Sequence, residues 1–519
     1  MTMSRPRSHI AAVLDALLAA VLLCACTVGP NFAPPSPKTP PHWSSRAIGG
    51  GRSPSDHPAD SPPQRRLTEQ AAELSRWWVA FRDPELGSLI ERGVSANLDL
   101  RAAVLRVEEA RAQRSIASAA YWPTISADAS YTRQRLSDTT PTGSLFNSIN
   151  SVHLPGGAAI SIPNPYNQFQ LSAAASWEVD LFGRVRRSVE AADAALQVSQ
   201  EDQRLVLVSV LADVAQSYTE LRGAQARLAV ARENLGTIEE LLDLTRRRLA
   251  AGLTTHIDVS NATAQATATR AALPAYELQI TEDINQLGKL LALEPEALRG
   301  ELGSPAPVPF VPGDVAIGLP AELARRRPDI REAEASLHAA TAQIGVATAD
   351  LFPRLTLSAM GGFQSQTTGN LLSWASRFGS FGPALDLPVL DRGRWETVRL
   401  YDVRAREAGL AYERTVLSAL HEVENSAAAY HADLERRAWL DATVAQNREA
   451  LTLSRQRYEN GVISFIDVLD VERTLEQNEL ALADSTTAAT VDLVTLYRAL
   501  GGGWQQPPRR IPDPVDPAK

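Results

Sequence analysis

The chain of 519 residues contains one series of motifs twice, in the same order. Asn97–Arg101 has its counterpart in Arg327–Arg331, and Gly252–Val259 has a closer counterpart in Gly461–Val468. The second pair shares a glycine, an apolar residue, Thr or Ser, and the triplet Ile-Asp-Val at matching places. Self-similarity of this extent indicates a duplicated structural unit. Whatever the chain folds into must therefore use one plan twice.

Each copy contains two stretches that predict very long helices. Gly183–Ala250 has no proline, and leucine recurs in it at positions 221, 228, 235, 242 and 249, a spacing of seven that is typical of helices packed as coiled coils. At about 1.5 Å per residue, such a helix is roughly 100 Å long. After a turn, Asp258–Leu293 is predicted to return as a helix that breaks at Pro274. The second copy repeats this pattern in Trp395–Asn460 and Ile466–Leu500.

Alternation of apolar and polar residues predicts a β-hairpin in each copy. From Gln168 to Leu181 every second residue is apolar, which indicates a strand with one apolar and one polar face. Its partner strand begins near Pro123, so the first hairpin is predicted over residues 123–181. The second hairpin is predicted over residues 354–388, which gives four strands per chain.

Four strands are too few to close a barrel. A sheet inside a bilayer has to close, because lipid offers no partner for an unpaired backbone group. Eight strands from two chains leave an interior filled by side chains, whereas twelve from three chains leave an aqueous lumen. The alternation fits a membrane barrel, although a half-buried soluble sheet alternates as well. Aromatic residues near the strand ends favour the membrane interpretation: Tyr121, Trp122, Tyr166, Phe169, Trp177 and Trp374.

The N-terminus has the pattern of an export signal. Arg5 and Arg7 precede an apolar stretch that ends in Leu-Cys-Ala-Cys at residues 23–26, which resembles a bacterial lipoprotein box. This resemblance implies cleavage before Cys26 and its modification with diacylglyceryl and N-acyl lipid. Residues 1–25 are then the signal peptide, and the proline-rich residues 26–65 a lipidated tether. The alternative is an ordinary signal peptide with two incidental cysteines.

These features predict an α+β membrane protein with an internal two-fold repeat. We expect a trimeric 12-stranded outer-membrane β-barrel, four strands per chain, continuous with a long α-helical periplasmic barrel. The first repeat is expected over residues 66–310, with its long helices at 183–293. The second is expected over residues 311–504, with its long helices at 393–500, and residues 505–519 form a tail.

Composition and motifs argue against several classes of function. The formal net charge of −9 and the lack of a basic patch with aromatic residues disfavour nucleic-acid binding. The sequence has no phosphate-binding loop and no protease or esterase motif, and its eight histidines are scattered. We therefore expect no catalytic residues, no metal site and no cofactor beyond the lipid on Cys26.

A set of motifs in a fixed order resembles the TolC-like outer-membrane factor family, in its lipoprotein branch of RND-type multidrug efflux channels (NodT/OprM-like). The resemblance implies a homotrimer in the Gram-negative outer membrane, lipid-anchored, with a periplasmic helical tunnel. It implies a passive exit duct for drugs or other small molecules, served by a periplasmic adaptor and an inner-membrane transporter of RND type. The motifs are Cys26–Pro30, Trp77–Leu86, Trp177–Arg184, Arg326–Ile330 and Gly461–Asp470.

The same resemblance implies a gate at the helix tips. Asp467 and Asp470 match the acidic ring of the family, Tyr458 matches its network tyrosine, and Asp258 the partner of that tyrosine in the first repeat. An alternative role for Asp258 and Asp467 is helix N-capping. The tip residues expected to dock the adaptor are Gly252, Leu253, Gly461 and Val462.

One position departs from the family pattern at this gate. Ile463 stands where some relatives carry an arginine, so Arg457 or Arg248 is the candidate substitute. Two other functions remain open from the sequence. One alternative is a duct for protein secretion or metal ions. The other is a lipid-anchored coiled-coil scaffold without a pore.

Overall fold

The computed structural model describes residues 27–36, 39–44, 67–70, 73–150, 163–310 and 314–505. Cys26 and the predicted signal peptide lie outside the described residues, as do most of the predicted tether and tail. The chain divides into two compact units. One comprises residues 1–33, 110–196 and 337–408, and the other comprises residues 34–109, 197–336 and 409–519.

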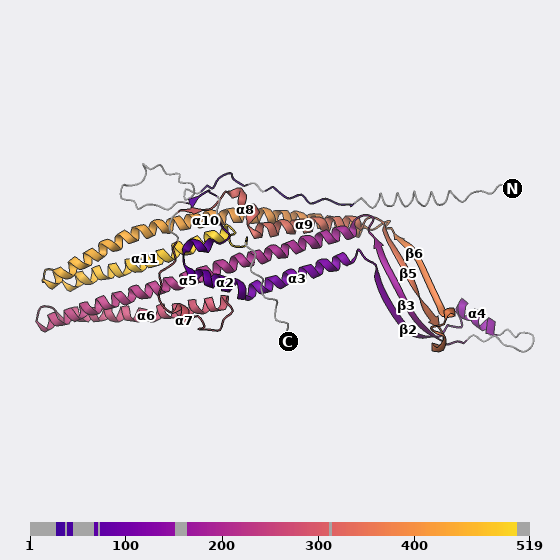
Figure 1. Cartoon of the computed structure of the whole chain (residues 1–519), viewed down its shortest axis with the longest axis horizontal. Coiled ribbons are helices and arrows are strands. Elements are labelled where there is room, and N and C mark those ends of the chain that lie inside the picture. The colour runs from indigo at the N-terminus through magenta and orange to yellow at the C-terminus, as the bar shows by residue number, and fades with distance from the viewer. Residues whose placement is uncertain are drawn as a thin grey trace, which may run out of the picture. The chain divides into compact units, whose positions relative to one another are not determined.

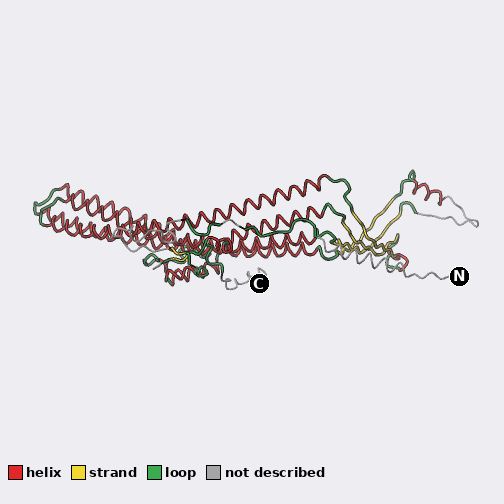
Figure 2. The backbone as a smooth tube through the Cα atoms, turned by 90° about the horizontal axis from the view of Figure 1, so that it is seen from above, coloured by secondary structure: helices red, strands yellow, loops and turns green. Residues whose placement is uncertain are grey.

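The long helices form two hairpins, which Figure 2 shows as paired red tubes joined by short loops. The first consists of α5 (Arg184–Ala250) and α6 (His256–Leu290), and the second of α10 (Arg392–Glu459) and α11 (Phe465–Ala499). The bounds confirm the predicted helices to within a few residues. In each copy the same plan therefore yields one helix of 67 or 68 residues and one of 35.

The predicted break at Pro274 is wrong, because α6 continues through it. Proline removes one backbone N–H and crowds the preceding turn, at a cost of about 3 kcal/mol in a helix interior. The helix buries small residues on the N-terminal side of this proline, including Ala262 and Ala266, against its neighbours. Packing along the remaining length of α6 outweighs the local cost.

The shorter helices precede the strands in each copy. In the first copy α2 (Pro84–Ala96) and α3 (Leu98–Ala119) are separated at Asn97, whose side-chain Oδ1 accepts from the amides of Asp99 and Leu100. In the second copy α8 (Pro320–Arg326) and α9 (Pro328–Ala349) are separated at Arg327. Further short elements are η2 (Trp77–Phe81), α4 (Pro141–Asn150), α7 (Arg299–Leu302), η3 (Thr368–Asn370), η4 (Trp374–Ser376) and the parallel pair β1 (Leu67–Thr68) with β4 (Val315–Ala316).

Four antiparallel strands form one sheet in the order β2-β3-β5-β6 (Figure 1). Their bounds are β2 (Thr124–Gln134), β3 (Tyr166–Val179), β5 (Arg354–Ser365) and β6 (Arg377–Asp386). Both predicted hairpins are confirmed, and β3 pairs with β5 to join them. Among the described residues β2 and β6 have no second partner strand, so each presents an open edge.

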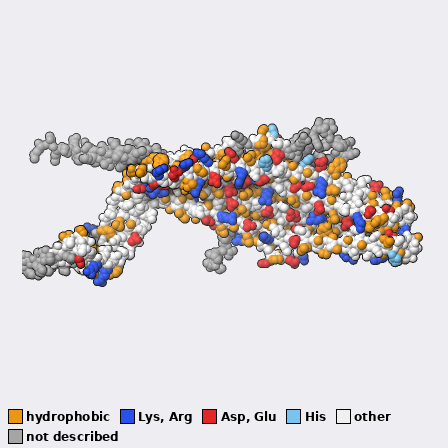
Figure 3. Space-filling model, turned by 180° about the vertical axis from the view of Figure 1, so that it is seen from behind, with side chains coloured by type: hydrophobic (Ala, Val, Ile, Leu, Met, Phe, Trp, Pro, Cys, Tyr) orange, Lys and Arg blue, Asp and Glu red, His pale blue; other side chains and the backbone are white. Residues whose placement is uncertain are grey.

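The register places most apolar residues of the four strands on one face, and in the described part of the chain that face is exposed. On it Ile125 is 73%, Tyr131 55% and Phe381 78% exposed. Leu171 pairs with Ala129 and Phe363, and its side chain is 41% exposed, whereas the next residue, Ser172, is only 6% exposed. A soluble sheet buries its apolar face instead. Figure 3 shows the charged side chains interspersed over the helices and sparse on the sheet. Among the described helices, none has the length and apolarity needed to cross a membrane.

Two clusters of buried side chains hold the helical part together. The larger gathers the η2 and α2 region with α5, α6, α10 and α11, and in it the Trp77 ring stacks on Tyr497 at 5.1 Å between centroids. The smaller, which we call the tip core, lies near the turns of the two hairpins. Its members are Ile238, Leu241, Leu242, Ala262, Ala266, Val444, Leu451, Tyr458, Phe465, Val468, Leu469 and Leu475.

Candidate functional site

The turns of the two hairpins have the same backbone geometry. Gly252 and Gly461 have φ angles of 72° and 74°, a left-handed conformation that glycine adopts without strain. In each turn the next amide closes back on the helix, from Leu253 to the Arg248 carbonyl at 2.8 Å and from Val462 to that of Arg457 at 2.9 Å. This is the glycine C-cap expected from the repeated motif. Leu253 and Val462 are exposed at the turns.

Each returning helix begins with a capping box, which confirms the alternative role of its aspartate. The Asp258 carboxylate accepts from the Thr255 amide at 3.0 Å, and the Asp467 carboxylate from the Ser464 amide at 2.9 Å. Hydrogen bonds from Ser464 lower the pKa of Asp467. At Asp258 partial burial raises the pKa, but hydrogen bonds from Thr254 and Thr255 outweigh it and lower the pKa overall. Both side chains are therefore ionised well below neutral pH.

Asp467 and Asp470 are both exposed, whereas Val468 and Leu469 between them are buried in the tip core. The two carboxylates thus lie on the outer side of α11, one helical turn from its start. Their predicted role in an acidic ring stays a prediction, since it concerns several chains. Asp470 differs from Asp467 in that the latter also caps the helix.

Arg248 connects the two hairpins at their tips. From the end of α5 its Nη1 donates to the Glu459 carbonyl at the end of α10, at 2.9 Å. Its guanidinium lies over the Tyr458 ring, 4.6 Å from the centroid, a favourable cation–π contact. Of the two arginines that the sequence offered as substitutes for the missing one, the structure therefore brings Arg248 to this place.

Among the described residues no hydrogen bond joins Tyr458 and Asp258. The Tyr458 ring is buried and packs edge-on against Phe465 at 5.9 Å between centroids, and its hydroxyl has no hydrogen-bond partner among the described residues. Asp258 instead bonds to Thr254 and Thr255. The pairing implied by the family resemblance stays a prediction.

Sequence reasoning missed a buried carboxylate on α11, directly behind the tip. Glu472 is 1% exposed, neither of its carboxylate oxygens has a hydrogen-bond partner, and its only ion pair among the described residues is with Arg455 at 3.6 Å. Burial, opposed by Arg455 and reinforced by Glu476 and Glu479, raises the pKa of Glu472 to about 7. The spacing of these three glutamates was the available signal, because it places them on one helix face with Leu469 and Leu475.

Replacing Glu472 is expected to remove a pH dependence of the second hairpin. The pKa in the folded chain is raised above the ordinary 4.5, so stability is full below pH 4.5 and falls as pH rises through about 7. The loss amounts to about 3 kcal/mol per chain above pH 8. Glu472→Gln cannot ionise, so hydrogen exchange of α10 and α11 around the tip core should differ less between pH 5 and pH 8 than in the parent chain, after correction for the intrinsic rate.

Glu449→Gln provides the control for this experiment, because Glu449 is exposed on α10. It should retain the pH dependence of the parent chain. Equal pH dependence in Glu472→Gln and in the parent would show that Glu472 is not the titrating group.

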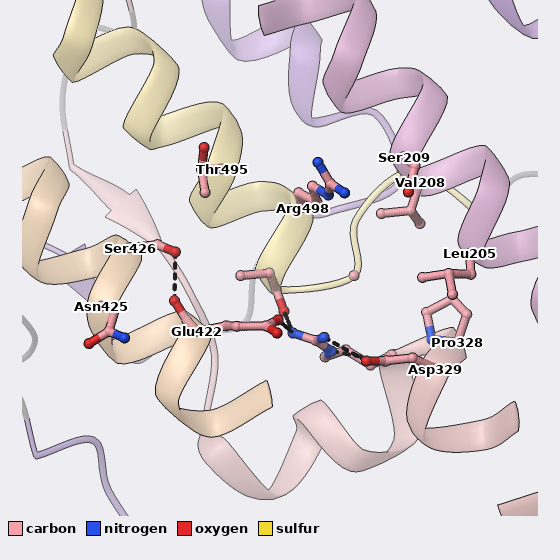
Figure 4. A pocket seen from close by; sticks show the side chains of 13 residues that line it. Leu205, Val208, Ser209, Pro328, Asp329, Glu422, Asn425, Ser426, Thr495 and Arg498 are labelled. Carbon is pink, nitrogen blue, oxygen red and sulfur yellow. Dashed lines mark hydrogen bonds and ion pairs between the residues drawn. The ribbon is translucent and has the colours of Figure 1, made fainter. Parts of the chain in front are cut away.

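A cavity of about 440 Å³ lies where the second copy's short helices meet α11 (Figure 4). Its charges are already paired: Arg327 binds Asp329 at 2.6 Å and Glu422 at 2.7 Å, and donates to the Ala499 carbonyl at the end of α11 at 2.9 Å. These contacts describe a structural joint and not a ligand site.

The first copy makes the equivalent joint with an uncharged side chain. Asn97, the counterpart of Arg327 in the repeated motif, donates to the Leu290 carbonyl at the end of α6, at 2.9 Å. In both copies, the residue before the helix that leads into the strands (α3 or α9) thus hydrogen-bonds to the C-terminal end of the returning helix (α6 or α11). This shared task explains why the motif occurs twice.

Comparison with known proteins agrees with this architecture. The family model described as outer membrane efflux protein matches residues 89–293 and 319–502. The outer membrane protein OprJ of Pseudomonas aeruginosa is 33% identical over 494 residues, which span 95% of this chain and 96% of OprJ. The antibiotic efflux pump outer membrane protein ArpC of Pseudomonas putida is 31% identical over 497 residues, which span 95% of this chain and 96% of ArpC.

Solved structures give the same result. The structure of the outer-membrane channel OprN superposes with a TM-score of 0.79 at 33% identity and covers 93% of this chain and 100% of that chain. The fold is therefore TolC-like, with long helices and a four-stranded antiparallel sheet in each chain.

Proposed function

Because this chain belongs to the outer membrane efflux protein family, we propose that three copies form the exit duct of a tripartite pump. The protein is the outer-membrane channel of an efflux system, with a periplasmic helical domain, and it is not an enzyme. Three four-stranded sheets side by side make twelve strands, and the long helices continue them as a periplasmic tunnel.

One observation carries the trimer: within the described residues the sheet exposes its apolar face and has no strand paired to either edge. Lipid covers an apolar face without cost, and a neighbouring chain pairs each edge, so that no backbone group is left unsatisfied in the bilayer. The polar face, with Ser126, Asp128, Ser130 and Thr132 on β2, then lines an aqueous lumen. Mass photometry of the protein extracted in mild detergent should give three chains, and a monomer would contradict the proposal.

The lipid and the partners complete the proposed assembly. Cys26 carries diacylglyceryl and N-acyl chains, which intact-mass measurement of the mature N-terminal peptide would reveal. A periplasmic adaptor docks on the exposed tip residues around Leu253 and Val462, and an inner-membrane transporter of RND type supplies the cargo. The name of ArpC makes antibiotics one of the proposed small-molecule cargoes. Drug susceptibility of a deletion strain tests the cargo, with protein secretion and metal tolerance as the alternatives.

Conductance of purified protein in planar bilayers tests the duct itself. Three copies of Asp467 and Asp470 around one axis would concentrate negative potential and favour cations. Asp470→Asn removes one charge per chain without disturbing the cap at Asp467, and we expect the cation preference in KCl gradients to fall at least two-fold. Glu449→Asn, on the exposed surface of α10, is the control and should leave the preference unchanged. A scaffold without a pore would show no conductance even in a variant with opened tips.

A further inference from the structure

The residues that directly follow Cys26 are held by one buried arginine. Arg187 of α5 is 4% exposed in its side chain and donates to the carbonyl of Val28 at 3.2 Å, that of Gly29 at 3.4 Å and the Asn31 side chain at 2.7 Å. Its Nη1 donates to the Glu190 carboxylate at 2.7 Å. A buried guanidinium is costly unless its donors are satisfied. Here most of its partners belong to the N-terminal segment.

Three glycines make room for that segment. Gly29 has a φ of 88°, and a Cβ there would lie 2.6 Å from the Gly345 backbone of α9. A Cβ on Gly345 would lie 2.8 Å from the Arg187 side chain, and one on Gly183 would lie 2.5 Å from Thr27. The segment therefore packs so closely against α9 and the start of α5 that a side chain at any of these three glycines would collide with its neighbours.

Two further contacts hold the segment at its ends. The Val28 amide donates to the Phe182 carbonyl at 3.2 Å, just beyond strand β3. The Phe32 ring stacks on His338 of α9 at 4.3 Å between centroids, and His338 contacts the same Glu190 at 3.0 Å. A flexible linker between a lipid anchor and a folded domain needs none of these contacts.

We propose that Arg187 is a positioning residue which clamps residues 27–32, the segment that follows the acylated cysteine, beside the junction of β3 and α5. Thr27, the neighbour of Cys26, contacts Gly183 at this junction, so the acyl chains enter the bilayer next to the end of the sheet. The lipid then sets the depth at which the sheet enters the membrane and aids its insertion. This inference rests on the proposed acylation of Cys26.

Hydrogen exchange of the full-length protein in outer-membrane lipid vesicles tests the clamp. In Arg187→Ala we expect the amides of residues 27–32 to exchange at least ten-fold faster than in the parent. Gly29→Ala should give the same loss with Arg187 intact, because it displaces the segment and not the arginine. Arg187→Lys keeps the charge but not the fork of donors and should lose most of the protection. Arg186→Ala is the matched control, since Arg186 binds Asp180 instead.

The yield of detergent-resistant trimer in the outer membrane tests the consequence. It should fall several-fold in Arg187→Ala and Gly29→Ala and stay at the parental level in Arg186→Ala. Unchanged protection of residues 27–32 in Arg187→Ala would overturn the clamp, and lost protection with a parental yield would overturn the positioning role.

A Cys26→Ser form separates the clamp from the lipid. It should keep the protection of residues 27–32, because the described contacts of the segment are made by Val28, Gly29, Asn31 and Phe32. Intact mass of the N-terminal peptide reports acylation on its own, so failure of the proposed lipidation is recognised without reference to exchange. Loss of protection in Cys26→Ser would show that the lipid, and not Arg187, holds the segment.

Discussion

Ala129→Arg is expected to abolish the channel in the outer membrane, whereas Ser130→Arg, one residue further along β2, is expected to leave it in place. Ala129 lies mid-strand on the exposed apolar face and pairs with Leu171, while Ser130 lies on the polar face and pairs with Gln170. An arginine on the lipid side of a barrel costs about 2–4 kcal/mol near the bilayer midplane. A trimer would incur this cost three times.

The measurement is the amount of detergent-resistant trimer in outer-membrane fractions, together with antibiotic susceptibility. Both arginines are equally large and equally charged, so the comparison depends only on the face of the sheet. Equal loss in both variants would indicate that β2 is packed against protein on both sides. Equal tolerance would mean that the apolar face does not contact lipid.

Arg248→Ala is expected to open the tip and to raise single-channel conductance at least ten-fold. The variant loses the bond to the Glu459 carbonyl and the contact with the Tyr458 ring, which are the links described between the two hairpins at their ends. A hydrogen bond from a charged donor contributes about 1.5–3 kcal/mol. Since about 1.4 kcal/mol changes an equilibrium ten-fold, losing one such link per chain suffices to shift a closed tip toward the open state.

Arg457→Ala provides the matched control, because Arg457 lies in the last turn of α10, directly before Tyr458, and is exposed. Its conductance should stay within two-fold of the parent. Arg248→Lys retains a charge over the ring and is expected to be intermediate. A closed channel in Arg248→Ala would place the lock elsewhere, and an open one in Arg457→Ala would reverse the assignment of the two arginines.

Much of the fold followed from the sequence because its determinants are local. Periodicity of seven in α5 and of two in β3 is written along the chain, and the glycines at 252 and 461 mark the turns. The error at Pro274 has the opposite origin. A proline rule concerns one turn of helix, whereas the packing that keeps α6 intact comes from neighbouring helices.

The site was predictable only in part, for the same reason. The aspartates of the two capping boxes lie three residues from their partners, so they could be recognised in the sequence. The contact of Arg248 with Tyr458 joins residues more than two hundred positions apart, and the sequence offered Arg457 with equal weight. The contacts of Arg187 with the N-terminal segment have no local signature, because Val28, Gly29 and Asn31 lie 156 to 159 positions earlier in the chain.

The two joints made by Asn97 and Arg327 leave the duplicated halves unequal in their response to salt. An amide that donates to a carbonyl is indifferent to dissolved ions, whereas the pairs of Arg327 with Asp329 and Glu422 include a half-exposed carboxylate that counterions can screen. High ionic strength should therefore weaken the joint at Arg327 more than the joint at Asn97. A chain built twice on one plan thus acquires two equivalent joints that respond differently to dissolved ions.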